Sequence, residues 1–323
     1  MSAVLKCLNL KGGYELSEVY VDAVSNVSLE LYRNEIFGIA GESGCGKSTL
    51  IKMMYGFIEP PMILRDGSIE LYTSNGEVFG VSSLGLENLR KNVWWKHISY
   101  IPQNAMNVLN PTMRIRDHFA EIYKEHMGIK KSESYVKARE YIEGFGLPSD
   151  VLSAFPHQLS GGMRQRVVIA LSLLFKPDIV LADEPTSALD VINQRVALMF
   201  LRNAQRKIEN TLVVVSHDMG VHSVLTDRLG IMYAGKIVEI GETQTIFEKP
   251  MHPYTEMLIK SLPRLGDKSQ RAGAQGQPPD LRYPPPGCRF HPRCPYSKDV
   301  CQREEPIFIE VEPNHYVSCW LKE

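Results

Sequence analysis

Two kinds of hydrophobic pattern alternate along the chain and predict a mixed α/β fold. Residues 21–32 (VDAVSNVSLELY) alternate apolar and polar positions, which is typical of a strand with one buried face. Uninterrupted apolar runs at residues 36–40 (IFGIA), 179–182 and 211–216 (TLVVVS) indicate fully buried strands. Two further apolar segments flank an Ala-Gly pair within residues 231–240, so we expect a hairpin there.

Helices are predicted where apolar residues recur at spacings of three and four. This pattern covers residues 115–145 in two segments, and it returns at residues 191–206. Residues 163–175 (MRQRVVIALSLLF) are apolar on most faces, which indicates a buried helix. We therefore expect an α/β core interrupted by a helical insertion near residues 85–160.

The last part of the chain has a different composition. Residues 267–286 are rich in Gly, Gln and Pro, which predicts a linker or an extended arm. Four of the six cysteines follow this arm. We expect this cysteine-rich tail, residues 287–323, to be an appendage of the core.

Length and charge narrow the class of protein. A chain of 323 residues can hold one large domain and a smaller one. Its 36 Lys and Arg against 37 Asp and Glu argue against binding nucleic acid through bulk positive charge. The N-terminus does not resemble a secretory signal, and no apolar stretch approaches the roughly 20 residues that span a bilayer. We expect a cytoplasmic protein whose membrane role, if any, comes through a partner.

Residues 41–48 (GESGCGKS) match the P-loop pattern G-x-x-x-x-G-K-[ST], between a predicted strand and a predicted helix. Glycines let backbone N–H groups surround a phosphate, Lys47 supplies a point charge, and the Ser48 hydroxyl is a natural Mg²⁺ ligand. The alternative is a Gly-rich turn with a chance Lys-Ser pair. The predicted phosphate-binding residues are Gly41, Ser43, Gly44, Cys45, Gly46, Lys47, Ser48 and Thr49.

A second candidate site ends the predicted strand at residues 179–182. Asp183 follows this strand, where a carboxylate can hold Mg²⁺ through water. The adjacent Glu184 could polarise an attacking water as a general base. The alternative is an Asp-Glu pair that starts a turn before Pro185.

The order of motifs then resembles the ATP-binding subunits of ABC transporters. Gln103 follows an apolar strand (ISYIPQ), and residues 159–163 read LSGGM between the two sites already described. Residues 187–190 read SALD, and His217 follows LVVVS. The resemblance implies a P-loop NTPase cassette with a RecA-like core, an antiparallel β part and a helical subdomain at about 85–165.

The resemblance also implies a site shared by two cassettes, which close head to tail on two ATP molecules. Ser160, Gly161 and Gly162 would contact the γ-phosphate held by the partner cassette, and Asp190 would link the two cassettes. Gln103 would reach Mg²⁺ and the attacking water, and His217 would contact the γ-phosphate. An aromatic residue near the N-terminus would stack on adenine; Tyr14 fits this place by its spacing, and Tyr20 is the alternative.

Three segments resemble one branch of this family, the ATPases of dipeptide and oligopeptide importers. They are GESGCGKST, NVLNPTMRI and HPYTEMLIKSLP at residues 252–263. The resemblance implies a cassette over residues 1–250, an arm over 251–286 and a tail over 287–323. It further implies a second cassette, two transmembrane permease subunits, an extracytoplasmic binding protein acting indirectly, and a peripheral place on the cytoplasmic face of the membrane. Import of oligosaccharides or nickel by a related transporter is the alternative.

The cysteines of the tail have the spacing Cys288-x5-Cys294-x6-Cys301-x17-Cys319. Disulfides, unrelated buried thiols, a structural Zn²⁺ site and an iron–sulfur cluster are the four interpretations. The spacing lacks the tight pair of cysteines common in zinc sites, and the resemblance to peptide importers favours a 4Fe–4S cluster. A short polar tail cannot build a core alone, so a metal centre would stabilise its fold.

Overall fold

The computed structural model describes residues 2–104, 107–187, 189–262 and 276–322. The chain divides into two compact units: the first comprises Met1–Val93 and Thr211–Glu323, and the second comprises Trp94–Asn210. Each unit is described by itself. Part of the predicted arm, residues 267–275, lies outside the described residues; the described part, residues 276–286, contains no helix or strand.

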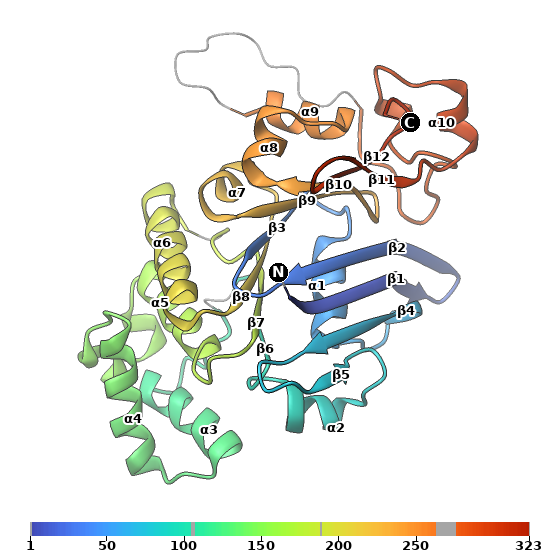
Figure 1. The fold of residues 1–323 in the computed structure, drawn as a ribbon. Coiled ribbons are helices and arrows are strands. Elements are labelled where there is room, and N and C mark those ends of the chain that lie inside the picture. Colours follow the sequence, from blue (N-terminus) through green and yellow to red (C-terminus); the bar gives the residue numbers. More distant parts are fainter. Residues whose placement is uncertain (1, 105–106, 188, 263–275, 323) are drawn as a thin grey trace. The chain divides into compact units, whose positions relative to one another are not determined.

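An antiparallel sheet occupies the N-terminal part of the first unit (Figure 1). Its strands are β1 (Ala3–Leu16), β2 (Val19–Tyr32), β4 (Met62–Tyr72) and β5 (Val78–Gly80). They lie in the order β2-β1-β4-β5. The strand predicted at residues 21–32 is confirmed as β2, which begins two residues earlier.

A second sheet of the first unit combines parallel and antiparallel pairs. Its strands are β3 (Ile36–Ala40), β8 (Thr211–Ser216), β9 (Arg228–Tyr233), β10 (Lys236–Glu242), β11 (Phe308–Glu312) and β12 (His315–Ser318). All five residues of β3 are buried, and this strand pairs in parallel with β8 and β9. The predicted buried strands and the β9–β10 hairpin are confirmed. The hairpin turns through Ala234 and Gly235, both with positive φ, as a two-residue turn between twisted strands requires.

The described residues of the first unit also include six α-helices, which Figure 1 labels. They are α1 (Lys47–Tyr55), α2 (Leu86–Asn88), α7 (Met219–Leu225), α8 (Thr243–Glu248), α9 (Pro253–Lys260) and α10 (Asp299–Arg303). A π-helical turn at Leu89–Val93 and a 3₁₀ turn at His291–Arg293 complete the helical segments. Fully buried Tyr233, Tyr254 and Phe290 lie in one hydrophobic core that joins β9, α9 and the tail.

The cysteine-rich tail is more closely integrated than an appendage. Strand β12 pairs antiparallel with β10, with Glu239 opposite Val317, so the tail extends the sheet of the first unit. His315 Nε2 lies 2.7 Å from Oε1 of Glu239, and both side chains are buried. The physical reason is that the tail has too few apolar residues for a core of its own, so it packs on the existing one.

The second unit contains two strands and four α-helices in its described residues. They are β6 (Ile98–Ile101), β7 (Ile179–Asp183), α3 (Ile115–Met127), α4 (Lys131–Gly144), α5 (Gly161–Ser172) and α6 (Val191–Ile208), with 3₁₀ turns at Ser149–Ser153 and Pro156–Gln158. Strands β6 and β7 pair in parallel. The predicted helices are confirmed, although α5 begins two residues earlier and ends before Leu173. In the described parts of both units, no helix combines the length and hydropathy needed to cross a membrane.

Candidate nucleotide-binding site

The P-loop follows β3 directly and leads into α1. Gly41 and Gly46 have φ values of 156° and 108°, and Gly46 is the N-cap of α1. A Cβ at Gly41 would lie 2.1 Å from the Met232 carbonyl oxygen, and one at Gly46 would lie 2.0 Å from that of Ala23. Only glycine fits these two positions, because both the backbone angle and the close approach exclude a side chain.

Lys47 is folded back over the loop that precedes it. Its Nζ donates to the carbonyl oxygens of Gly41 at 2.8 Å and Glu42 at 2.9 Å, and the side chain is buried. Its charge therefore lies inside the curve of the loop, beside the N-terminus of α1. A helix N-terminus together with a buried cation forms an environment that stabilises a bound anion.

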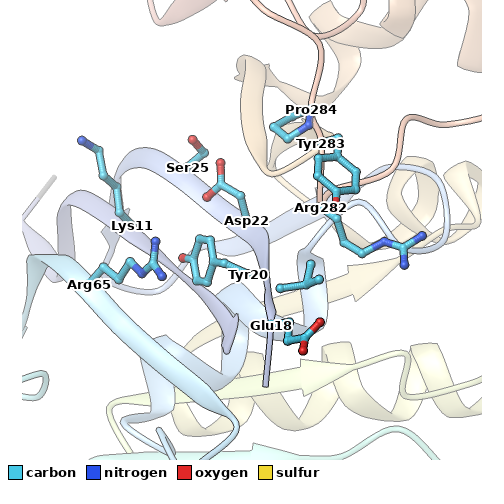
Figure 2. A pocket seen from close by; sticks show the side chains of 10 residues that line it. Lys11, Glu18, Tyr20, Asp22, Ser25, Arg65, Arg282, Tyr283 and Pro284 are labelled. Carbon is cyan, nitrogen blue, oxygen red and sulfur yellow. The ribbon is translucent and has the colours of Figure 1, made fainter. Parts of the chain in front are cut away.

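Tyr14 and Tyr20, the two candidates for stacking on adenine, have different surroundings. The hydroxyl of Tyr14 lies 3.1 Å from Oγ1 of Thr49, in the first turn of α1. Tyr20 instead lines a pocket of about 480 Å³ whose other side chains are mostly charged (Figure 2). The Arg65 guanidinium lies 3.3 Å from the centre of the Tyr20 ring, so that ring face is occupied. Of these two tyrosines, Tyr14 is the one with a hydrogen bond to α1 in the described residues.

His217 is brought to the P-loop edge of the sheet by strand pairing. In the parallel register of β3 and β8, Ala40 lies opposite Ser216. Gly41, the first residue of the P-loop, directly follows Ala40, and His217 directly follows Ser216. Both therefore lie at the carboxyl ends of adjacent parallel strands. This is where ligands bind in open α/β sheets. The His217 side chain is exposed.

The carboxylates and Gln103 meet within the second unit. The register of β6 and β7 places Ile101 opposite Ala182. Asp183, the last residue of β7, therefore lies near the end of β6, which Gln103 follows by two residues. Gln103 Nε2 lies 3.4 Å from Oε2 of Glu184. Asp183 is buried and accepts a hydrogen bond of 3.1 Å from the hydroxyl of Tyr100 on β6. The sequence interpretation missed Tyr100, whose position within an ordinary apolar strand gave no signal of this contact.

The residues of the LSGG and SALD segments form helix N-termini in the second unit. The Ser160 hydroxyl accepts from the Met163 N–H at 3.3 Å and caps α5, which begins with Gly161 and Gly162. Asp190 caps α6 by accepting from the N–H groups of Ile192 and Asn193. The Asn193 side chain and these N–H groups hold the pKa of Asp190 below its usual range. Residue 188, within SALD, lies outside the described residues.

The four cysteines of the tail are all free thiols in the described residues. Burial raises the pKa of Cys288 to about 11, and the nearby thiol groups of Cys301, Cys319 and Cys294 add to the rise. The Cys288 N–H donates to the Cys301 carbonyl oxygen at 2.8 Å. Within the described residues, however, no group of three or more His, Cys, Asp or Glu side chains is arranged to hold a metal ion.

Two further residues near the P-loop were missed by the sequence interpretation. The Tyr254 hydroxyl accepts from the Glu42 N–H at 2.9 Å, and the Arg293 guanidinium pairs with the Glu42 carboxylate. These contacts join positions 212 and 251 residues apart, so no local pattern could indicate them.

Comparison with known families gives two matches along the chain. The model of the ABC transporter family matches residues 24–187. The model of the oligopeptide/dipeptide transporter C-terminal region matches residues 238–301, a span that includes three of the four tail cysteines.

Individual proteins are similar over most or all of the chain. A dipeptide transport ATP-binding protein of Caldanaerobacter subterraneus is 38% identical over all of the chain and 98% of its own length. An oligopeptide transport ATP-binding protein of Bacillus subtilis is 37% identical over 93% of the chain and 84% of its own length. A solved dimeric ATP-binding cassette, bound to ADP and phosphate after hydrolysis, has a TM-score of 0.62 and 27% identity, covering 74% of the chain and 98% of that structure.

Proposed function

Since the chain belongs to the ATP-binding subunits of ABC transporters, in the family of dipeptide and oligopeptide importers, we propose that it drives peptide import by hydrolysing ATP. The observation that carries the proposal is that one chain combines a nucleotide-binding feature with a feature of peptide transporters. One is the P-loop with Lys47 buried in its curve. The other is the match to the C-terminal region of peptide transporters.

The predicted fold class is confirmed by the likeness to solved cassettes. The chain has the mixed α/β architecture of a P-loop NTPase with an added antiparallel sheet. The chain is accordingly an ATPase subunit. We propose the division into a cassette over residues 1–250, an arm over 251–286 and a tail over 287–323.

In the first unit, the proposed phosphate ligands are the backbone N–H groups and side chains of the P-loop. Lys47 would move from its carbonyl partners toward the β- and γ-phosphates, and His217 would contact the γ-phosphate. Tyr14 would stack on adenine, which its contact with Thr49 supports. The proposed phosphate-binding set is Gly41, Ser43, Gly44, Cys45, Gly46, Lys47, Ser48 and Thr49.

In the second unit, Glu184 is the proposed general base. Asp183 and Gln103 are proposed to interact with bound Mg²⁺. Bound Mg²⁺ would neutralise phosphate charge, with Ser48 as its ligand from the P-loop. Glu184 has φ of 46°, a left-handed backbone that is uncommon for a residue other than glycine. Strained backbone of this kind persists where its surroundings fix it, often at functional sites. The 3.4 Å contact with Gln103 fits a role for both groups on one water molecule.

The N-termini of α5 and α6 are proposed to act on a partner cassette. Ser160, Gly161 and Gly162 open α5, where N–H groups are available to an anion, so they would contact the γ-phosphate held by the partner. Asp190 would link the two cassettes. The proposed partner is a second cassette, identical or paralogous. Together with two permease subunits it would hold the chain at the cytoplasmic face of the membrane, with a binding protein delivering the cargo outside.

For the tail, we propose a 4Fe–4S cluster on Cys288, Cys294, Cys301 and Cys319, with Zn²⁺ as the alternative. The donor set fits in chemistry, because the tail carries four free thiols, and the Cys288 N–H donates to the Cys301 carbonyl oxygen at 2.8 Å. Iron, sulfide and zinc analysis of anaerobically purified protein tests this, and stoichiometric zinc without iron would overturn it.

The experiment for ATP hydrolysis is the Glu184→Gln variant. It removes the proposed base and keeps the side-chain shape, so phosphate release should stop while ATP stays bound and the cassettes remain paired. Glu143→Gln, at an exposed position of α4, is the matched control and should hydrolyse ATP normally. Unaltered turnover by Glu184→Gln would show that the base has been assigned wrongly.

A further inference from the structure

We propose that Arg293 of the cysteine-rich tail is a positioning residue for the P-loop. Through Glu42 it holds the loop in its phosphate-binding conformation, so its loss weakens nucleotide binding without removing any group that contacts nucleotide. The inference rests on the proposed function, because it takes the P-loop as the ATP site.

The contact between Arg293 and Glu42 is a two-pronged ion pair. Nη1 of Arg293 lies 2.7 Å from Oε2 of Glu42, and Nη2 lies 2.9 Å from Oε1. The Arg293 side chain is 5% exposed and the Glu42 side chain 25%. Paired, nearly parallel hydrogen bonds between a guanidinium and a carboxylate fix orientation as well as distance, and they are stronger than bonds between neutral groups. Tyr233 adds a further contact, since its hydroxyl accepts from Nη1 at 3.3 Å.

Glu42 is fixed at its main chain too. Its N–H donates to the hydroxyl of Tyr254, which is fully buried at the start of α9. Its carbonyl oxygen accepts from Nζ of Lys47 at 2.9 Å. The second residue of the P-loop is thus held from three sides: by α9, by the tail and by the lysine that serves the phosphates.

This arrangement predicts an effect on nucleotide affinity. Ordering the backbone of a loop residue costs conformational entropy, and a loop that is already ordered spares the ligand this cost. Removing Arg293 frees the Glu42 carboxylate, while the main-chain contacts of Glu42 with Tyr254 and Lys47 remain. Since tenfold in affinity corresponds to about 1.4 kcal/mol, we expect the dissociation constant to rise on the order of tenfold.

The position of Arg293 connects this effect to the state of the tail. Arg293 is the last residue of the 3₁₀ turn at His291–Arg293, and Cys294 follows it directly. Four residues earlier, Arg289 anchors the same segment by donating to the Ala234 carbonyl oxygen and to Oγ of Ser25. Any change that releases this segment withdraws Arg293 from Glu42, so the nucleotide site responds to the integrity of the tail.

The test is calorimetric binding of Mg-ADP to the purified full-length chain. Arg293→Gln and Glu42→Gln should each raise the dissociation constant on the order of tenfold, and the double variant should be no worse than either alone. Arg293→Lys keeps the charge but loses the paired geometry, and it should fall between. Arg303→Gln, an exposed arginine of α10, is the matched control and should bind like the parent protein.

Two further readouts separate positioning from general damage. In ATP hydrolysis, Arg293→Gln should raise KM and leave kcat at saturation unchanged, and amide exchange in β12 should stay protected. A folded Arg293→Gln protein with an unchanged dissociation constant, or fully additive effects in the double variant, would overturn the inference. Lys47→Ala separates a failure of this inference from a failure of the proposed ATP site. If Lys47→Ala also binds Mg-ADP normally, the assignment of the P-loop as the ATP site is wrong.

Discussion

Phe290 provides the sharpest test of how the tail is attached. Its side chain is 1% exposed and lies against three rings, with centroids 5.1 Å from Tyr233, 5.5 Å from Tyr254 and 5.6 Å from His252. The Tyr233 contact is edge-to-face, with an interplanar angle of 88°. We expect Phe290→Ala to destabilise the docked tail strongly, because it leaves a cavity between β9, α9 and the tail.

The magnitude follows from the burial. Removing a fully buried Phe side chain costs about 3–5 kcal/mol in transfer and cavity energy. At about 1.4 kcal/mol per factor of ten, the opening equilibrium of the tail should increase on the order of 10²- to 10⁴-fold. The assay is hydrogen–deuterium exchange of peptides covering residues 287–319, since local opening governs amide exchange.

Phe308→Ala is the matched control for this experiment. Phe308 lies in the same tail on β11 but is 39% exposed, and it stacks on Tyr316. The same chemical change there should accelerate exchange far less. If Phe290→Ala changed exchange by less than threefold, or no more than Phe308→Ala, the tail would not depend on this core.

Two other predictions concern adenine and pH. Tyr14→Ala should weaken ATP binding on the order of tenfold, because aromatic stacking on a base is worth about 1–3 kcal/mol. Tyr20→Ala should bind ATP normally in the same calorimetric titration. The reverse result would show that Tyr20 stacks on adenine instead of Tyr14. Burial lowers the pKa of His252 to about 4, and its Nδ1 accepts from the Tyr254 N–H. In the unfolded chain the His252 imidazole binds a proton near pH 6.5, whereas in the folded chain it stays neutral until about pH 4. The free energy of unfolding should therefore fall as pH drops from 6.5 toward 4. Burial also lowers the pKa of His222 to about 4, so this histidine contributes in the same direction. His252→Asn, which keeps an acceptor but does not titrate, should reduce the slope in urea unfolding, and an unchanged slope would show that His252 does not contribute.

The sequence predicted what depends on local pattern. The buried strand at residues 36–40, the P-loop after it and the helices of the second unit follow from periodicity, glycine placement and capping residues. The close approach of Gly46 to Ala23 explains why the motif contains glycine at that position.

Long-range contacts could not be predicted in the same way. The pairing of β12 with β10 depends on only two residue pairs, Glu239 with Val317 and Ile240 with Tyr316. The attachment of Arg293 to Glu42 joins two polar residues whose neighbours in sequence give no sign of the partner. Such contacts are set by the packing of the whole unit, which periodicity does not encode.

Peptide uptake in cells tests the central claim most directly. The chromosomal copy of this chain is replaced by Glu184→Gln or by the control Glu143→Gln, and uptake of labelled dipeptides and oligopeptides is measured beside that of a free amino acid. The account predicts that Glu184→Gln abolishes uptake of the peptides and spares the amino acid, while Glu143→Gln transports both. Peptide uptake that continues at the parental rate in Glu184→Gln cells would contradict it.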